Sequence, residues 1–76
     1  MTDTERIRRM WGARLTAARQ ARGWSQTDVT AATGIAPATL SRYENGHRLP
    51  GPGAQIALAD ALGVDHADLF SVETSA

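Results

Sequence analysis

The positive charges of this chain are unevenly distributed. Between Arg6 and Arg48 the only acids are Asp28 and Glu44, so this stretch holds eight arginines and two carboxylates. From Leu49 onward there is no basic residue. The formal net charge of +0 therefore combines a basic part suited to phosphates with an acidic part that phosphates repel. The arginines are Arg6, Arg8, Arg9, Arg14, Arg19, Arg22, Arg42 and Arg48. The acids after Leu49 are Asp60, Asp65, Asp68 and Glu73.

Arg42 is the arginine whose surroundings best suit it to contact a base of DNA. It belongs to a short helical pattern in which Leu40 and Tyr43 share one face, so its own side chain is expected on the exposed side. Arginine can form two parallel hydrogen bonds with a guanine in the major groove of DNA. The alternative is an arginine that is solvated or bound to a phosphate.

Catalysis and metal binding have no comparable support in the sequence. No nucleophile, base and orienting group stand in a recognisable arrangement, and Gly51–Gly53 lacks the strand and lysine of a phosphate loop. His47 has no second histidine or carboxylate at metal-ligand spacing. The chain also has no cysteine and no long apolar run, so we expect no disulfide, signal peptide or membrane span. We expect a cytoplasmic, nucleoid-associated protein with no enzymatic activity, no cofactor and no small-molecule substrate.

Residues 25–46 contain two short helical patterns around a sharp turn. Ser25 is a good N-cap for the first helix, and Asp28 completes a capping box. Gly34 can end that helix in the left-handed conformation, and Pro37 suits the first turn of the next. Two helices this close in sequence must cross steeply, so the second projects outward. That geometry allows a helix to enter the major groove of DNA.

The whole chain is expected to form an all-α domain of five helices around one core. A chain of 76 residues has room for a single domain, whose ordered core is expected over about residues 6–71, with frayed ends on both sides. The expected helices cover about residues 4–21, 26–33, 37–45, 52–62 and 66–70. Asp65 is expected to cap the last of them, with Asp68 completing the box.

Helical spacing and side-chain size predict which residues face the core. The predicted core residues are Trp11, Leu15, Ala18, Trp24, Leu40, Tyr43, Ile56, Ala59 and Leu62. Phe70 is harder to place, because with Leu62, Val64 and Leu69 it could instead form an exposed apolar patch. We therefore hypothesise a homodimer through the last two helices, with Val64, Leu69 and Phe70 in its interface.

From about Trp11 to Phe70 the chain resembles the Xre, or lambda-repressor-like (Cro-like), helix-turn-helix family. The matching residues, in order and spacing, are Trp24–Gln26, Val29, Gly34–Ile35, Thr39–Gly46 and Arg48–Pro50. The resemblance implies a compact five-helix DNA-binding domain with the helix-turn-helix motif at its second and third helices.

Three residues depart from the family pattern. Thr30 replaces the usual small residue of the first motif helix, Thr33 replaces a large apolar residue, and Ala36 replaces a hydroxyl cap. We expect Thr30 to hydrogen-bond a carbonyl one turn earlier, whereas Ala36 loses a cap worth about 1 kcal/mol.

The resemblance also implies roles for individual residues. Its base-reading positions correspond to Pro37, Ala38, Ser41 and Arg42. Its phosphate-binding positions correspond to Gln26, Thr39, Asn45, His47 and Arg48. An ordinary solvated side chain is the alternative for Gln26 and for His47. The arginine and glutamate that form a structural ion pair in the family correspond to Arg19 and Glu44.

These observations favour a sequence-specific transcriptional regulator that binds a double-stranded DNA operator, expected to be an inverted repeat, as a dimer. A Cro-like phage repressor, a restriction-modification controller and a stand-alone Xre-type regulator all fit the length. The alternative is a protein-interaction module, such as an antitoxin, in which DNA binding is secondary.

Overall fold

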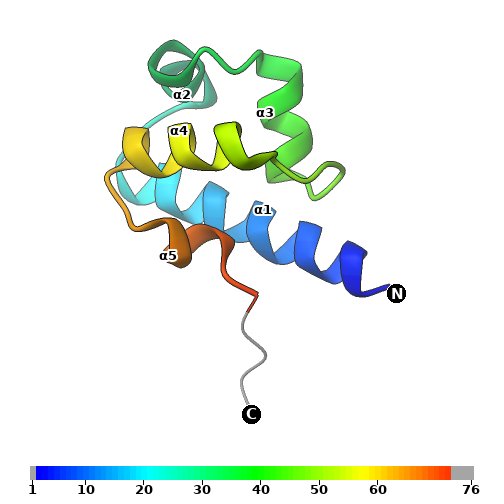
Figure 1. Ribbon diagram of the computed structural model, residues 1–76. Coiled ribbons are helices and arrows are strands. Elements are labelled where there is room, and N and C mark those ends of the chain that lie inside the picture. Colours follow the sequence, from blue (N-terminus) through cyan, green and yellow to red (C-terminus); the bar gives the residue numbers. More distant parts are fainter. Residues whose placement is uncertain (1, 73–76) are drawn as a thin grey trace.

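Five helices and no strand make up residues 2–72, the part of the chain that the computed structural model describes (Figure 1). The helices are α1 (Asp3–Ala21), α2 (Gln26–Thr33), α3 (Pro37–Glu44), α4 (Pro52–Leu62) and α5 (His66–Phe70). The predicted all-α architecture is confirmed, and the predicted helix ends lie within one residue of those observed. The end of the chain predicted to fray after Ser71 extends mostly into residues 73–76, which lie outside the described range.

The start of α1 is more ordered than the sequence analysis predicted. Thr2 and Glu5 form a capping box: the Glu5 backbone N–H donates to the Thr2 hydroxyl at 3.1 Å, and a Glu5 carboxylate oxygen accepts from the Thr2 backbone N–H at 3.3 Å. The Glu5 carboxylate accepts hydrogen bonds from the Thr2 backbone N–H and, at 3.0 Å, from the Thr2 hydroxyl. These two bonds, the backbone one first, hold the pKa of Glu5 below its ordinary value. The prediction of a frayed segment before Arg6 is therefore wrong, since the helix begins with a satisfied first turn.

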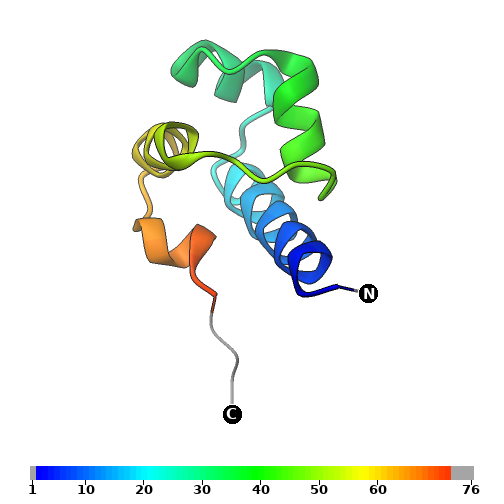
Figure 2. The same cartoon turned by 45° about the vertical axis from the view of Figure 1, so that its right-hand side comes forward.

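The motif turn follows the sequence prediction closely. Ser25 and Asp28 form the expected capping box at the start of α2, and Gly34 ends that helix at φ 76°. A residue with a Cβ is strained at this φ, which explains the glycine. The chain then passes Ile35 and enters α3 at Pro37, so α2 and α3 are joined by only three residues and cross steeply (Figure 2).

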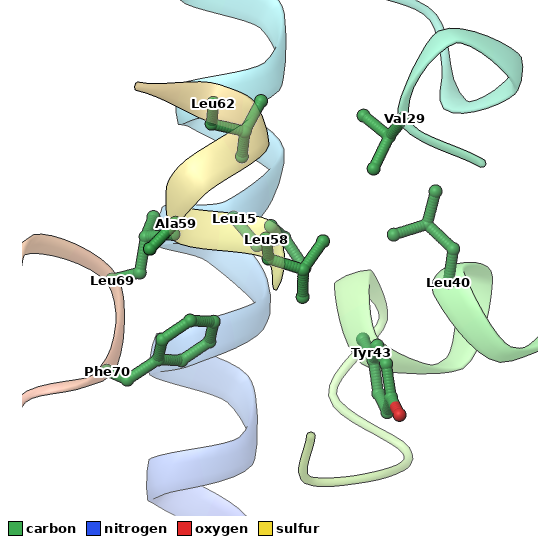
Figure 3. Close-up of a cluster of buried hydrophobic side chains, with 9 residues drawn as sticks. All are labelled: Leu15, Val29, Leu40, Tyr43, Leu58, Ala59, Leu62, Leu69 and Phe70. Carbon is green, nitrogen blue, oxygen red and sulfur yellow. The ribbon is translucent and has the colours of Figure 1, made fainter. Parts of the chain in front are cut away.

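The core lies between all five helices, and nine buried apolar side chains form it (Figure 3). They are Leu15, Val29, Leu40, Tyr43, Leu58, Ala59, Leu62, Leu69 and Phe70. Trp11, Ala18 and Trp24, which were predicted as core, are only partly buried and pack against the edge of this cluster. Each tryptophan also has a polar role or partner: Trp11 Nε1 donates to the Ser71 carbonyl at 3.1 Å, and the Arg22 guanidinium lies over the Trp24 ring.

Two predictions about the last two helices are wrong. Ile56 was expected to face inward but is 58% exposed, because α4 is turned so that Leu58 faces the core instead. The predicted apolar patch does not form either: Leu69 and Phe70 are buried, with Phe70 in edge-to-face contact with Trp11, and Leu62 is buried as well. A five-residue helix packed across α1 can bury both of its large side chains, which helical spacing alone does not reveal.

Capping of α5 also differs from the prediction. The Asp65 side chain accepts no capping hydrogen bond; instead the Asp65 backbone carbonyl accepts from the Asp68 N–H at 3.0 Å. The Asp65 carbonyl thus accepts the hydrogen bond from the Asp68 N–H that the Asp65 carboxylate was expected to accept. The C-terminal end of α5 is held by Ser71, whose carbonyl accepts hydrogen bonds from Trp11 Nε1 and from Arg14 Nη1.

Thr30 does not make the hydrogen bond predicted for it. Its hydroxyl oxygen is buried and has no partner within the described residues. Thr33, one turn further along, makes the expected type of bond, donating to the Val29 carbonyl at 2.8 Å and accepting from the Ile35 N–H at 3.2 Å. A buried hydroxyl without a partner keeps its desolvation penalty.

We expect Thr30→Ala to stabilise the domain, because it removes an unsatisfied buried hydroxyl and introduces a better helix former. Chemical denaturation should show a free energy of unfolding higher by about 1 kcal/mol. Thr33→Ala is the matched control and should lower the free energy of unfolding by a similar amount. A loss of stability in Thr30→Ala would show that its hydroxyl has a partner.

Candidate nucleic-acid interface

One face of α3 is buried in the core and the opposite face is open to solvent. Leu40 is 0% exposed and Tyr43 is 7% exposed, so they fix which side of the helix faces inward. Among the predicted base-reading residues, Pro37, Ala38 and Arg42 are exposed, and Ser41 is partly exposed. In Figure 1, α3 stands at the edge of the molecule, where it begins at the end of the segment that comes from α2 and runs down towards α1. The structure thus brings the predicted base-reading residues together on one accessible helix.

The last turn of α3 is fixed by a network of hydrogen bonds at Glu44. Arg19 of α1 donates to both carboxylate oxygens, from Nε at 2.8 Å and from Nη2 at 3.1 Å. The Gln26 side-chain amide donates to the same carboxylate at 3.1 Å. Arg19 Nη1 also donates to the Trp24 carbonyl at 2.8 Å. The predicted ion pair is confirmed, and it joins α1, the start of α2 and the end of α3.

This ion pair is largely removed from water. The side chain of Arg19 is 14% exposed and that of Glu44 is 5% exposed. A bidentate pair of this kind has a defined geometry, and removing one partner leaves a buried charge without compensation. It also neutralises the one carboxylate of α3, which would otherwise repel a phosphate.

Gly12 brings α1 and α3 into direct backbone contact, a feature that the sequence analysis did not identify. A Cβ at Gly12 would lie 2.6 Å from the Glu44 carbonyl oxygen and 2.7 Å from the Tyr43 carbonyl oxygen. No side chain fits in that space without a shift of the backbone. A glycine inside an otherwise regular helix is the available signal, since such a residue often marks a close packing contact.

The first turn of α3 carries no side-chain cap. Ala36 occupies the N-cap position and makes no side-chain hydrogen bond, as predicted, and Pro37 begins the helix. Backbone N–H groups at an uncapped helix start, together with the helix dipole, attract anions. This end of α3 therefore combines exposed side chains with a positive electrostatic potential.

The loop after α3 presents the remaining predicted phosphate-binding residues. Asn45, His47 and Arg48 are exposed. The loop is held in place because the His47 N–H donates to the Arg42 carbonyl at 2.9 Å and Gly46 adopts a φ of 75°. The Asn45 side-chain amide donates to the Ser41 carbonyl at 2.9 Å, so it closes the helix end.

The other predicted site residues have varied surroundings. Thr39 is partly exposed on α3. The side-chain amide of Gln26 bonds Glu44, and because an amide nitrogen has two hydrogens, one donor remains for another acceptor. Val64, Leu69 and Phe70 lie away from this surface and belong to the core or its edge.

Within residues 2–72, no three His, Cys, Asp or Glu side chains are grouped as a metal site would require. None of the helices in that range combines the length and apolar character needed to cross a membrane.

Comparison with known proteins places this arrangement in a family. A family model described as a helix-turn-helix domain matches residues 11–70. The chain belongs to this family. Helix-turn-helix domains that bind DNA place the second helix of the motif, here α3, in the major groove. Among curated protein sequences, none matches the chain significantly.

Two solved structures are similar to this one over most of their length. The restriction-modification controller protein C.AhdI from Aeromonas hydrophila shares 28% sequence identity with a TM-score of 0.79, and the match covers 83% of this chain and 96% of that one. The clp gene regulator ClgR from C. glutamicum shares 27% identity with a TM-score of 0.78, covering 83% of this chain and 82% of that one.

We expect Arg19→Ala to lower the free energy of unfolding by about 3 kcal/mol, because it leaves the Glu44 carboxylate buried without its partner. Thermal and chemical denaturation measure the loss. Arg19→Lys is the matched control and should recover only part of it, because lysine keeps the charge but cannot bond both carboxylate oxygens and Trp24 together. A wild-type melting temperature for Arg19→Ala would show that the pair does not hold the motif in place.

Proposed function

We propose that the protein is a sequence-specific DNA-binding transcriptional regulator that places α3 in the major groove. The observation that supports this most is Arg42, exposed on the outer side of a helix whose inner side is buried and whose last turn is locked by Arg19 and Glu44. A rigidly held side chain can discriminate between bases, because its hydrogen bonds form without further ordering of the helix.

Direct reading of bases would be sparse on this surface. Arg42 is the one long side chain among the proposed base-reading residues, and it is suited to guanine. Ser41 can donate or accept one hydrogen bond, and Pro37 and Ala38 can offer apolar contact to a thymine methyl group. We propose that sequence-dependent DNA shape supplies the rest of the specificity.

Phosphate contacts would lie on both sides of α3. On one side are Gln26 and the start of α2, and on the other are Asn45, His47 and Arg48, with Thr39 on α3 itself. Contacts of this kind fix the position of a protein on the duplex and make binding salt-dependent. The similarity to a restriction-modification controller protein and to a clp gene regulator supports a role in controlling transcription.

We also propose that two copies bind an inverted repeat. One α3 reaches only a few base pairs, whereas a two-fold pair reads two half-sites about one helical turn apart. Leu69 and Phe70 do not supply its interface, because both are buried within the monomer. The exposed large apolar side chains among the described residues are Leu49, Ile56 and Val72.

A selection from random duplexes, followed by binding measurements on the selected sequence, tests the role of Arg42. We expect Arg42→Ala to weaken binding to the selected duplex by about 1–3 kcal/mol and to relax the preference at one base pair. Arg42→Lys is the matched control, because lysine keeps the charge but has no planar fork for guanine.

Unchanged base preference in both variants would mean that Arg42 binds a phosphate or is solvated. If the wild-type protein enriches no sequence and is not retained on random DNA at low salt, the DNA-binding proposal is wrong. The protein-interaction module would then become the leading function.

Analytical ultracentrifugation tests the pairing of two copies. We expect two protein chains on each duplex that carries the selected inverted repeat, and one chain on a duplex with a single half-site. A monomer at high protein concentration that also binds the full repeat as a single copy would contradict the dimer.

A further inference from the structure

A groove of about 360 Å³ lies between the N-terminal half of α1 and the loop after α3. In both ribbon views the N-terminal half of α1 passes below this loop, on the same side of the molecule as α3 (Figures 1 and 2). Helix α1 contributes Glu5, Arg8, Arg9 and Ala13 to the lining, and the end of α3 and the loop contribute Glu44, Asn45, Gly46 and His47. The groove therefore joins the first arginines of the chain to the loop proposed to bind phosphates.

Two contacts fix the loop against α1. Arg8 Nε donates to the Gly46 carbonyl at 3.2 Å. Gly46 itself packs directly on Arg9, since a Cβ at Gly46 would lie 3.1 Å from the Arg9 Cα. Gly46 also needs its positive φ of 75°, so this position excludes other residues for two reasons. The position of Arg9 relative to His47 is thus set by packed backbone and does not depend on a mobile tail.

Arg6 and Arg9 form no ion pair with any of the described residues. Arg6 and Arg9 are exposed, and the single ion pair within residues 2–72 joins Arg19 to Glu44. Arg6 and Arg9 are three residues apart on one helix, where like charges repel. Arg9 is attracted to the Glu5 carboxylate four residues earlier, which adds a little to the effect of the Thr2 hydrogen bonds in lowering the pKa of Glu5. An exposed attraction of this kind contributes little to the stability of the fold.

The two acids of the groove are already engaged. One carboxylate oxygen of Glu5 accepts from both the backbone N–H and the hydroxyl of Thr2, at 3.3 and 3.0 Å. The Glu44 carboxylate is taken up by Arg19 and Gln26. Glu5 keeps its negative charge, but Arg8 and Arg9 line the same groove and the exposed Arg6 and Arg48 are close to the lining residues in the sequence, so positive charges outnumber it, which suits an anion.

We propose that Arg6 and Arg9 bind the DNA backbone beyond the half-site contacted by α3, extending the phosphate contacts of His47 and Arg48 along α1. This inference rests on the proposed DNA binding. The ligand is a run of phosphodiesters on the same duplex, because the surface is continuous with the α3 loop and carries separated positive charges without an apolar platform. Such contacts add affinity without sequence preference.

The test compares Arg6→Gln/Arg9→Gln with wild-type protein on two labelled duplexes of equal length, one selected by the wild-type protein and one of random sequence. The double variant should weaken binding to both by the same factor, on the order of tenfold or more at about 0.1 M salt. The slope of log K against log salt should become shallower by about 2, or about 0.9 for each lost phosphate contact. Its melting temperature should match that of the wild type, since neither arginine has an ion-pair partner in the described fold.

Two control variants separate the position of the charge from its presence. Arg6→Lys/Arg9→Lys keeps both charges and should retain the wild-type salt slope. Arg22→Gln removes one charge at the opposite end of α1, where the guanidinium lies over Trp24 and bonds the Leu62 carbonyl, and should also leave the slope unchanged.

An unchanged salt slope in Arg6→Gln/Arg9→Gln would overturn this inference and leave DNA binding by α3 intact. A drop in affinity on the selected duplex alone would overturn it as well, because phosphate contacts do not distinguish sequences. If wild-type protein binds neither duplex at low salt, the proposed function fails, and the inference fails with it.

Discussion

The orientation of α3 depends on how its last turn is attached to α1. The Glu44 carboxylate accepts hydrogen bonds from Arg19 and from Gln26, and the backbone carbonyls of the same turn lie against Gly12. These contacts hold one end of the helix from two sides, while Leu40 holds its inner face in the core. The outer face of the helix is open to solvent. Its first turn, which follows the N-cap residue Ala36, has no side-chain cap. The helix is therefore held by its inner face and its last turn, while its outer face, which includes Arg42 in that last turn, remains exposed.

A buried ion pair is a costly way to gain stability, but it is a specific way to set an orientation. An apolar contact of the same size would stabilise the helix at least as well. The fork of Arg19 on Glu44 has one geometry, and it also bonds the Trp24 carbonyl next to the start of α2. The ion pair thus fixes α1, the start of α2 and the end of α3 relative to one another. The same pair removes a negative charge from a surface otherwise rich in arginine, so orientation and charge complementarity arise from one interaction.

Much of the motif could be predicted because its signals are local. Ser25, Gly34 and Pro37 each act through the backbone within a few residues, so their effects appear in the sequence itself. The pairing of Arg19 with Glu44 came from the family resemblance. The misplacement of Ile56 and Phe70 has a different origin: helical spacing defines a face but not the neighbour that the face meets. The contact of Gly12 with α3 and the hydrogen bond of Gln26 to Glu44 likewise depend on residues distant in sequence.

We propose that the exposed face of α3 and its flanking loops form the DNA-binding surface of a rigid domain. Titrating duplex DNA into isotope-labelled protein, with amide chemical shifts as the readout, tests it most directly. We expect shift changes concentrated on α3, the start of α2 and the loop at Asn45–Arg48, with the amides of α4 and α5 largely unaffected. Changes concentrated on α4 and α5, or spread evenly over the domain, would contradict it.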